Sequence, residues 1–242
     1  SACGWKRCRE NKAMCGRFTL RSDEKILKAR FPALPAASHL RARYNIGPGQ
    51  PVGAWLADPQ ARWEWFSWGL IPHWATSPPQ GGGWINARSE TVAEKPAFRD
   101  GWRRRRCLVP ADGWYEWRRE GKVARPHFFS REDGAPFAFA GIADAWHDGA
   151  GGVIVGLALL TTRPNRLARQ VHHRMPVILR EEDEGDWLDP CTPLAALTRM
   201  MEPVAGDGFT VREVSQKVNA VRNEGPSLLE PLPPRPSQGE LF

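Results

Sequence analysis

The chain has 242 residues, 41% of them hydrophobic and 25% charged, which fits one globular domain, or at most two, and argues against wholesale disorder. No apolar run approaches the roughly 18 residues of a membrane-spanning helix, and the first fourteen residues lack the apolar stretch of a secretory signal. We therefore expect a cytoplasmic protein that does not enter a membrane. The formal net charge of +7 is typical of proteins that contact a phosphate backbone, although a basic surface kept for solubility is the alternative.

The first half of the chain predicts short elements separated by turns, as its many glycine and proline residues favour. Residues 1–14 are polar and show no apolar period, so we interpret them as a leader or a remnant that is removed. A strand is expected over residues 16–20, followed by a helix that Ser22 caps and that runs to about Arg30. Beyond it, the sequence predicts a turn-rich stretch at 43–51, an aromatic strand at 62–70 and a loop at 74–84.

The second half of the chain predicts mainly strands, at 107–110, 127–130, 136–142, 153–162, 176–179 and 209–214. A helix is expected at 194–201, because Thr192 and Pro193 precede it in the positions favoured for a cap and a first-turn proline. Residues 225–242 are rich in proline and predict a disordered tail. These elements predict the α+β class, with a single domain over residues 15–224 that has a curved, barrel-like, mainly antiparallel β core and a few helices.

The cysteines are not arranged as a metal site or a disulfide framework. They are odd in number, widely spread and without C-x-x-C spacing: Cys3, Cys8, Cys15, Cys107 and Cys191. A chain without an export signal is expected to keep its thiols reduced. We therefore expect no metal and no cofactor, and each cysteine is either buried filler or a nucleophile.

Cys15 follows Met14, and a methionine before a small residue is the arrangement from which an initiator methionine is trimmed. A chain that begins at Cys15 carries a 1,2-aminothiol whose α-amine, with a pKa of about 7.7–8.0, is partly unprotonated at neutral pH. The amine attacks an aldehyde to give an imine, and the thiol then closes on the imine carbon to give a thiazolidine. The alternative is a buried small hydrophobic residue that happens to follow a methionine.

Other segments combine residue types that suit recognition or proton transfer. Asn86 offers a donor and an acceptor, and Arg88 shares its face if the stretch is extended and is suited to grip a phosphate. Glu116 lies between two aromatic residues, a setting that suits a general acid or base, and His172 titrates near neutrality. The alternatives are a polar loop with a solvated arginine and a strand-face glutamate paired with an arginine. Four arginines at 103–106 stand beside aromatic residues, which favours a patch that contacts a phosphate backbone.

Taken in chain order, these segments resemble the SRAP family of SOS response-associated peptidases, or abasic-site processing proteins. The matching strings are MCGRF (14–18), RYNIGPGQ (43–50), WGLIPHW (68–74), NARSET (86–91), RRCLVPADGWYEW (105–117), FAGIADAW (139–146), TT (161–162) and VHHRMPVIL (171–179). One such string is weak support, whereas eight in one order are specific. They cover nearly all of the predicted fold.

The resemblance implies a single α+β domain with a barrel-like β core, a basic groove for single-stranded DNA, and a covalent cross-link to abasic sites through the N-terminal cysteine, here Cys15. It places the other catalytic residues at Asn86, Glu116 and His172. It places DNA-binding residues at Arg17, Asn45, Trp74, Arg88, Trp117 and Arg174.

This sequence departs from the family pattern in two places. Residues 1–13 precede Met14, and in such a chain Cys15 has an amide nitrogen in place of an amine. The family reaction therefore requires either that Met14 is the true start or that the leader is removed. The domain's own peptidase-like activity is one route for this removal. The turn RYNIGPGQ replaces the more usual Ala-Pro-Thr, and Gly47 and Gly49 put one hydroxyl contact to DNA in question.

The leading hypothesis is a monomeric, nucleoid-associated DNA-damage protein that binds single-stranded DNA containing abasic sites and forms a thiazolidine with the ring-opened aldehyde, which shields the lesion. A non-covalent single-stranded DNA-binding module on the same basic, tryptophan-rich surface is one alternative. A cysteine peptidase with Cys15 as nucleophile and His172 as base is the other. An adduct that survives boiling in detergent supports the first hypothesis, and scission of an unrelated peptide supports the peptidase.

Overall fold

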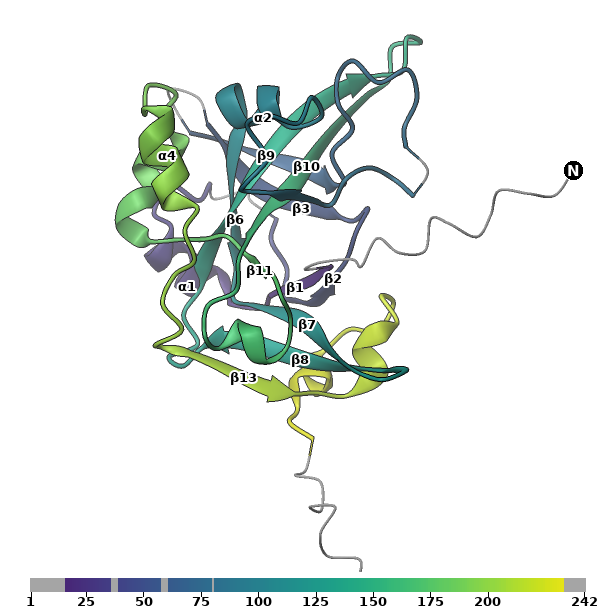
Figure 1. Ribbon diagram of the computed structural model, residues 1–242, viewed down its shortest axis with the longest axis vertical. Coiled ribbons are helices and arrows are strands. Elements are labelled where there is room, and N and C mark those ends of the chain that lie inside the picture. Colours follow the sequence, from purple (N-terminus) through teal and green to yellow (C-terminus); the bar gives the residue numbers. More distant parts are fainter. Residues whose placement is uncertain (1–15, 36–38, 58–60, 80, 233–242) are drawn as a thin grey trace, which may run out of the picture.

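The computed structural model describes residues 16–35, 39–57, 61–79 and 81–232, and it places them in two β-sheets flanked by short helices (Figure 1). The strands are β1 (Arg17–Leu20), β2 (Arg43–Ile46), β3 (Pro51–Leu56), β4 (Arg62–Trp68), β5 (Asn86–Arg88), β6 (Arg106–Ala111), β7 (Gly113–Glu120), β8 (Val123–Arg131), β9 (Phe137–His147), β10 (Val153–Thr162), β11 (Met175–Pro176), β12 (Ile178–Leu179) and β13 (Phe209–Glu213). The α-helices are α1 (Glu24–Arg30), α2 (Arg99–Arg104), α3 (Glu184–Leu188) and α4 (Leu194–Met200). Within the described residues, no helix is long and apolar enough to cross a membrane.

The larger sheet closes into a barrel. Strands β10, β4, β3, β6 and β9 form the ring, because β10 pairs with β4 on one side and with β9 on the other. All pairings in the ring are antiparallel except β10–β4, and β5 adds to β10 in parallel. The prediction of a barrel-like, mainly antiparallel core is therefore confirmed.

The smaller sheet has the order β13-β8-β7-β1-β2, is antiparallel throughout, and lies below the barrel in Figure 1. Phe18 of β1 joins the two sheets, since its ring lies 5.2 Å from that of Trp68 and 5.8 Å from that of Phe139. Trp114, opposite Phe18 on β7, stacks on Phe129 with ring centroids 4.7 Å apart. These aromatic contacts give the two sheets one common core, with β1 of the smaller sheet packed against the barrel.

The end of β1 is fixed by Asp112, whose carboxylate accepts hydrogen bonds from the Thr19 hydroxyl (2.6 Å) and from the Ser22 amide (2.7 Å). The Ser22 hydroxyl also donates to Asp112, at 2.9 Å, so it is not available to cap α1. The prediction that Ser22 caps this helix is wrong, and Asp23 takes that place by accepting from the amide of Ile26 at 2.9 Å.

The structure also corrects two boundaries. The turn predicted at 43–51 is confined to residues 47–50, because Arg43–Ile46 form β2 and Pro51 begins β3. The predicted tail begins too early, since Pro226–Leu229 form a 3-10 turn (η4) with Leu228 and Leu229 buried, and Pro231 bridges to Val214. The leader, Cys15 and residues 233–242 lie outside the described residues.

Residues 214–232 form what we call the C-terminal strap, which packs on the outer face of the smaller sheet. The strap contains the 3-10 turns η3 (Gln216–Asn219) and η4, and its apolar residues form a second cluster with Tyr115 and Phe128. Burial raises the pKa of Tyr115, and its hydroxyl donates to the carbonyl of Tyr44 at 2.8 Å. The strap therefore ties β7 and β2 together beside β1.

Candidate active site and nucleic-acid interface

The beginning of β1 lies beside the middle of β7. Arg17 is opposite Tyr115 in the antiparallel pairing, and one more residue in this register places Gly16 opposite Glu116. Cys15 is outside the described residues, but it is bonded to Gly16. The register therefore places Gly16, the first described residue, beside Glu116.

Glu116 is buried, with 1% of its surface exposed. The Nδ1 atom of His172 lies 3.8 Å from its carboxylate, and the His172 side chain is 14% exposed. The backbone amide of Arg174 donates to the same Nδ1 at 3.2 Å, which fixes the orientation of the ring. The structure thus brings together two of the predicted catalytic residues, with the imidazole at the rim of the site and the carboxylate beneath it.

Asn86 and Arg88 come to the site from the barrel. They are the ends of β5, with Ala87 buried between them, so the expectation that they share a face of an extended segment is confirmed. Strand β10 joins this pair to the histidine segment: Arg88 is opposite Thr161, and Thr161 is opposite Pro176 of β11. Arg88 is exposed, as a phosphate contact requires, whereas Asn86 is half-buried.

Arg174 is a buried member of this group and has protein partners. Its guanidinium donates to both carboxylate oxygens of Glu90, at 2.5 and 2.8 Å, and to the carbonyl of Thr161 at 2.5 Å. Burial raises the pKa of Glu90, but the hydrogen bonds and positive charge of Arg174 outweigh it and hold that pKa below its ordinary value. Arg174 therefore joins the histidine segment to β10 and to Glu90.

The Glu90 pair predicts a pH dependence. Because the pKa of Glu90 is lower in the folded protein, the stabilisation it gives is complete above the ordinary glutamate pKa and is lost as the pH falls through the lowered value. We expect Glu90→Gln to lower the melting temperature at pH 7, and the gap to the unmodified protein to close on acidification below about pH 4. Thermal melts across this range check it, with Glu94→Gln, an exposed site without an ion pair among the described residues, as control. A gap that does not change with pH contradicts the assignment.

Arg17 and Asn45 form a second group, built around the C-terminal strap. Arg17 donates to the carbonyl of Val218 at 2.7 Å, and burial lowers its pKa. Asn45 is fully buried, accepts from Arg17 at 3.3 Å, and donates to the carbonyls of Val218, Ala220 and Asn223 at 3.0–3.2 Å. In this structure Asn45 presents no polar atom to a ligand. It positions Arg17 and the strap, and the direct DNA contact that the resemblance implies for Asn45 stays a prediction.

Removal of the Asn45 side chain is expected to weaken the fold. The Asn45→Ala substitution leaves the strap carbonyls without their donor, and we expect a loss of about 2–4 kcal/mol in the free energy of unfolding. Urea denaturation measures it. Asn219→Ala is the matched control, because Asn219 is exposed and its side chain accepts a single bond, from Trp117 at 2.8 Å, so its loss should cost well under about 1 kcal/mol. Equal losses in the two variants contradict the role given to Asn45.

The two predicted aromatic contacts differ in exposure. Trp74, in the loop that follows β4, is 53% exposed, and its indole N–H makes only a long bond, 3.4 Å, to the carbonyl of Pro96. Trp117 is half-buried on β7, where Asn219 of the strap holds its indole N–H. Both leave ring surface accessible for stacking on a base. In contrast, six of the tryptophans in the described residues are buried: Trp55, Trp68, Trp102, Trp114, Trp146 and Trp187.

The run of four arginines is not wholly available for contact with phosphate, because Arg106 is buried, whereas the arginines at 103–105 are exposed. Arg106 is 1% exposed and donates to the carbonyls of Trp187 (2.8 Å) and Asp189 (2.7 Å). Arg105 pairs with Asp144, which also accepts from the imidazole of His73 at 2.9 Å. Two members of the run are therefore structural, since they bind the loop after α3 and β9. No spacing signal in the sequence separates buried Arg106 from its exposed neighbours.

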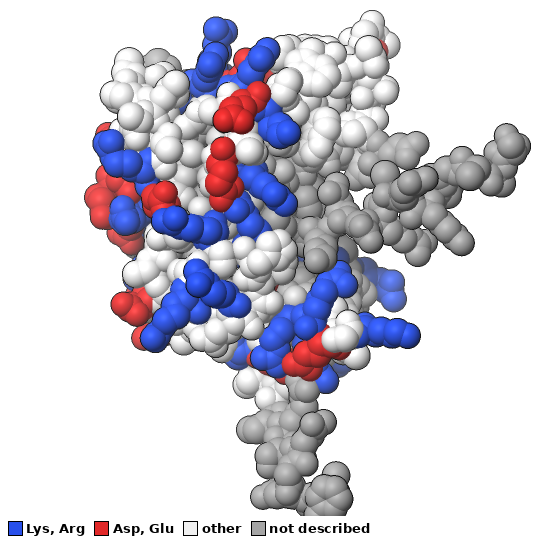
Figure 2. Space-filling view, in the orientation of Figure 1, with Lys and Arg blue, Asp and Glu red and all other residues white. Residues whose placement is uncertain are grey.

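The surface around the site is basic. Figure 2 shows more Lys and Arg than Asp and Glu side chains over the lower part of the molecule, where β7, β8 and β13 lie in Figure 1. The β7–β8 hairpin contributes Arg118 and Arg125, which share Glu120 as an ion-pair partner. Among the described residues there is no group of three or more His, Cys, Asp or Glu side chains that is able to hold a metal ion.

The fold is thus a closed barrel with a second sheet, and Glu116 and His172 lie together beside the first described residue of the chain. The model of the SOS response associated peptidase (SRAP) family matches residues 14–221, and the chain belongs to this family. The match begins at Met14, the residue before Cys15.

Full-length relatives and solved structures agree with this membership. The chain is 37% identical over 222 residues to the abasic site processing protein YoqW of Bacillus subtilis, covering 90% of this chain and 99% of that protein. It is 30% identical over 227 residues to the abasic site processing protein YedK of Escherichia coli, covering 90% and 100%. A crystal structure of a Bacteroides thetaiotaomicron protein superposes with a TM-score of 0.79 at 25% identity, covering 90% of this chain and 100% of that one.

Proposed function

We propose that this protein processes abasic sites in single-stranded DNA by forming a covalent thiazolidine between Cys15 and the ring-opened abasic sugar, which shields the lesion during the response to DNA damage. The names of its relatives support the lesion as substrate. The observation that carries the proposal is the pairing of β1 with β7, whose register puts Gly16 opposite the buried Glu116. The Nδ1 atom of His172 lies 3.8 Å from the Glu116 carboxylate.

The reaction needs only groups that the chain and the lesion supply. The free α-amine of Cys15 adds to the C1′ aldehyde to give a carbinolamine, which loses its hydroxyl as water and becomes an imine. The Cys15 sulfur then adds to the imine carbon, its proton passes to the nitrogen, and a five-membered ring closes. One water is released in total, and no oxidant or reductant is consumed.

The surrounding residues serve proton transfer and positioning in this scheme. Water leaves the carbinolamine only after its hydroxyl is protonated, a task for Glu116 or His172 as general acid. The same pair takes protons from the amine and the thiol in the other steps. The Asn86 amide, with a donor and an acceptor at the edge of the barrel, orients the amine against the aldehyde.

The lesion strand is held by charge and stacking. Arg88 is exposed beside Asn86 and neutralises a phosphate, while Trp74 and Trp117 offer ring surface to bases that flank the lesion. Because these contacts release counterions, affinity for DNA falls steeply as the salt concentration rises.

The proposal requires a free amine on Cys15, and so a mature chain without the residues before it. Trimming of Met14 from a chain that starts there meets this requirement. Self-cleavage of the Met14–Cys15 bond meets it for a longer chain, and the peptidase activity is proposed here for this step only.

The proposal is tested on a denaturing gel. Protein with Cys15 at its N-terminus is incubated with an oligonucleotide that carries one abasic site and, separately, with the undamaged oligonucleotide. We expect a slower band that survives boiling in detergent, with the abasic strand only. Reversible binding of both strands without this band overturns the covalent step in favour of a DNA-binding module, and cleavage of an unrelated peptide without the band favours a cysteine peptidase.

A further inference from the structure

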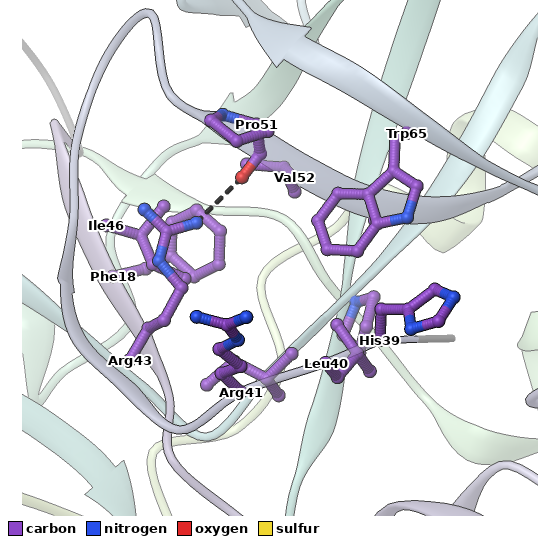
Figure 3. Close-up of a pocket in the computed structure, with 12 residues that line it drawn as sticks. Phe18, His39, Leu40, Arg41, Arg43, Ile46, Pro51, Val52 and Trp65 are labelled. Atoms are coloured by element: carbon purple, nitrogen blue, oxygen red, sulfur yellow. Dashed lines mark hydrogen bonds between the residues drawn. The ribbon is translucent and has the colours of Figure 1, made fainter. Parts of the chain in front are cut away.

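A cavity of about 210 Å³ lies away from the Glu116–His172 pair, where the β1–β2 edge of the smaller sheet meets β3 and β4 of the barrel. Its apolar wall is made by Phe18, Leu20, Ile46, Val52 and Pro110. Figure 3 shows Phe18 and Ile46 on one side, with Trp65 across the cavity from them. The wall is formed by residues already held in the core, so the cavity is a preformed feature of the fold.

Trp65 stands at the mouth of this cavity. Its side chain projects from β4 and is 42% exposed, although it is one of the largest apolar groups in the chain. It meets Trp63 in an edge-to-face contact, with ring centroids 6.4 Å apart. An accessible indole beside an apolar cavity is suited to stack on a flat, partly polar ring, as bound bases do.

The charged residues around the cavity are all basic. Arg43 donates to the carbonyl of Pro51 at 2.7 Å and to the side chain of Gln50, so it is fixed in place. Arg41 is exposed and forms no hydrogen bond or ion pair with the described residues. None of the residues that line the cavity is acidic. The flat apolar surface of Trp65 and the exposed guanidinium of Arg41 together fit a ligand that has an aromatic ring and an anionic group.

The cavity is connected to the proposed DNA path through the 47–50 turn. The Gln50 side chain that holds Arg43 also accepts from the amide of Gly47, at 3.0 Å. Gly47 lies directly against Arg17, so closely that a Cβ at position 47 would be 3.1 Å from the guanidinium Nε. The turn therefore connects Arg17 to Arg43 and Arg41, so a DNA strand bound at Arg17 reaches these two arginines by following the turn.

We propose that this cavity binds one unpaired nucleobase of the lesion-bearing strand, stacked on Trp65, with Arg41 neutralising the adjacent phosphate. The proposal rests on the proposed function, because it takes its ligand to be the same single strand. It adds a second binding site, separate from the reacting groups. It predicts that nucleotides a few positions away from the lesion contribute to binding affinity, although the covalent reaction does not need them.

The test uses oligonucleotides in which 2-aminopurine, a base whose fluorescence falls on stacking, replaces each nucleotide in turn on both sides of the abasic site. We expect strong quenching at one or two positions of the oligonucleotide that lie further from the lesion than its immediate neighbours. Trp65→Leu should remove the quenching there, and Trp84→Leu, at another exposed tryptophan, should not. We also expect Trp65→Leu to weaken binding of a long oligonucleotide about tenfold, since the stack on Trp65 is lost.

A charge variant tests the phosphate contact. Arg41→Gln should reduce the slope of log affinity against log salt by about 0.7, the value for one phosphate on a single strand. Arg199→Gln, at an exposed arginine in the last turn of α4, should leave the slope unchanged. Melting temperatures of all variants confirm that each one folds.

The outcomes separate this proposal from the proposed function. If adducts form normally but quenching is absent, or persists in Trp65→Leu at every position, the nucleobase site is wrong and the covalent function stands. If poly-glutamate peptide shifts the Trp65 indole N–H resonance and an undamaged oligonucleotide does not, the cavity takes an acidic peptide instead. If adducts never form but the Trp65-dependent quenching is seen, the nucleobase site stands and the covalent function is wrong.

Discussion

Cys15→Ala is expected to lose the adduct that survives boiling, yet to keep a linkage that borohydride traps. Alanine at the N-terminus retains the α-amine, so the imine still forms, but no sulfur is present to close the ring. An imine reverts in water, whereas its reduced form is a stable amine. The variant should therefore give only background signal without borohydride and a clear band with it.

A blocked N-terminus should behave differently. A chain that retains one residue before Cys15 keeps the thiol but has an amide in place of the amine, so it should form neither the heat-stable adduct nor a borohydride-trapped linkage at this position. Cys191→Ala is the matched control, because Cys191 is an exposed free thiol outside the site, and it should react normally. Full adduct formation by the blocked chain would show that sulfur alone attacks the lesion.

Glu116→Gln is expected to slow adduct formation by about 10²- to 10⁴-fold, the usual contribution of a well-placed general acid or base. Glutamine has nearly the same shape, so it should fit the buried position without a cavity, but it neither gives nor accepts a proton at neutral pH. Single-turnover kinetics with a saturating abasic oligonucleotide measure the rate of the covalent step separately from binding.

Glu120→Gln serves as the control for Glu116, because it lies on the same strand, four residues on, at the exposed end of β7. It should react at the normal rate. Comparable melting temperatures for the two variants exclude unfolding as the cause of any difference. Equal rates for Glu116→Gln and the unmodified protein would remove Glu116 from the chemistry and leave His172 as the proton donor.

Much of the fold was predictable from local pattern. Runs of apolar residues predict strands at 153–162 and 136–142, and the structure has β10 (Val153–Thr162) and β9 (Phe137–His147) there, both buried on both faces over most of their length. The strand Gly113–Glu120 was not predicted, because a glutamate is among its four buried first residues and charged residues follow, so the segment shows neither a long apolar run nor a regular alternation. The short helices α2 and α3 were missed as well, since six and five residues are too few to show a helical period.

The candidate site was predictable only in part. The local sequence indicates that Glu116 and His172 suit proton transfer, but not that β7 and the segment before β11 bring them together. The family resemblance assigned Asn45 to DNA binding and the charge run assigned Arg106 to a phosphate-contacting patch, and the structure shows both as buried donors to backbone carbonyls. Their partners lie more than 80 residues away along the chain, Val218 for Asn45 and Trp187 for Arg106. The local sequence therefore does not indicate these contacts. The last part of the C-terminal strap, residues 225–232, was predicted to be tail because this segment is rich in proline and has only two buried leucines, Leu228 and Leu229.

The intact mass of the adduct tests the central claim most directly. Protein purified from cells is incubated with an abasic oligonucleotide, and the product is measured without reduction. The account predicts a chain that begins at Cys15 and an adduct equal to protein plus oligonucleotide minus one water, with the bond mapped to the first residue. An adduct on any other residue, or a native chain whose Cys15 nitrogen stays permanently in a peptide bond while the lesion is still captured, would contradict it.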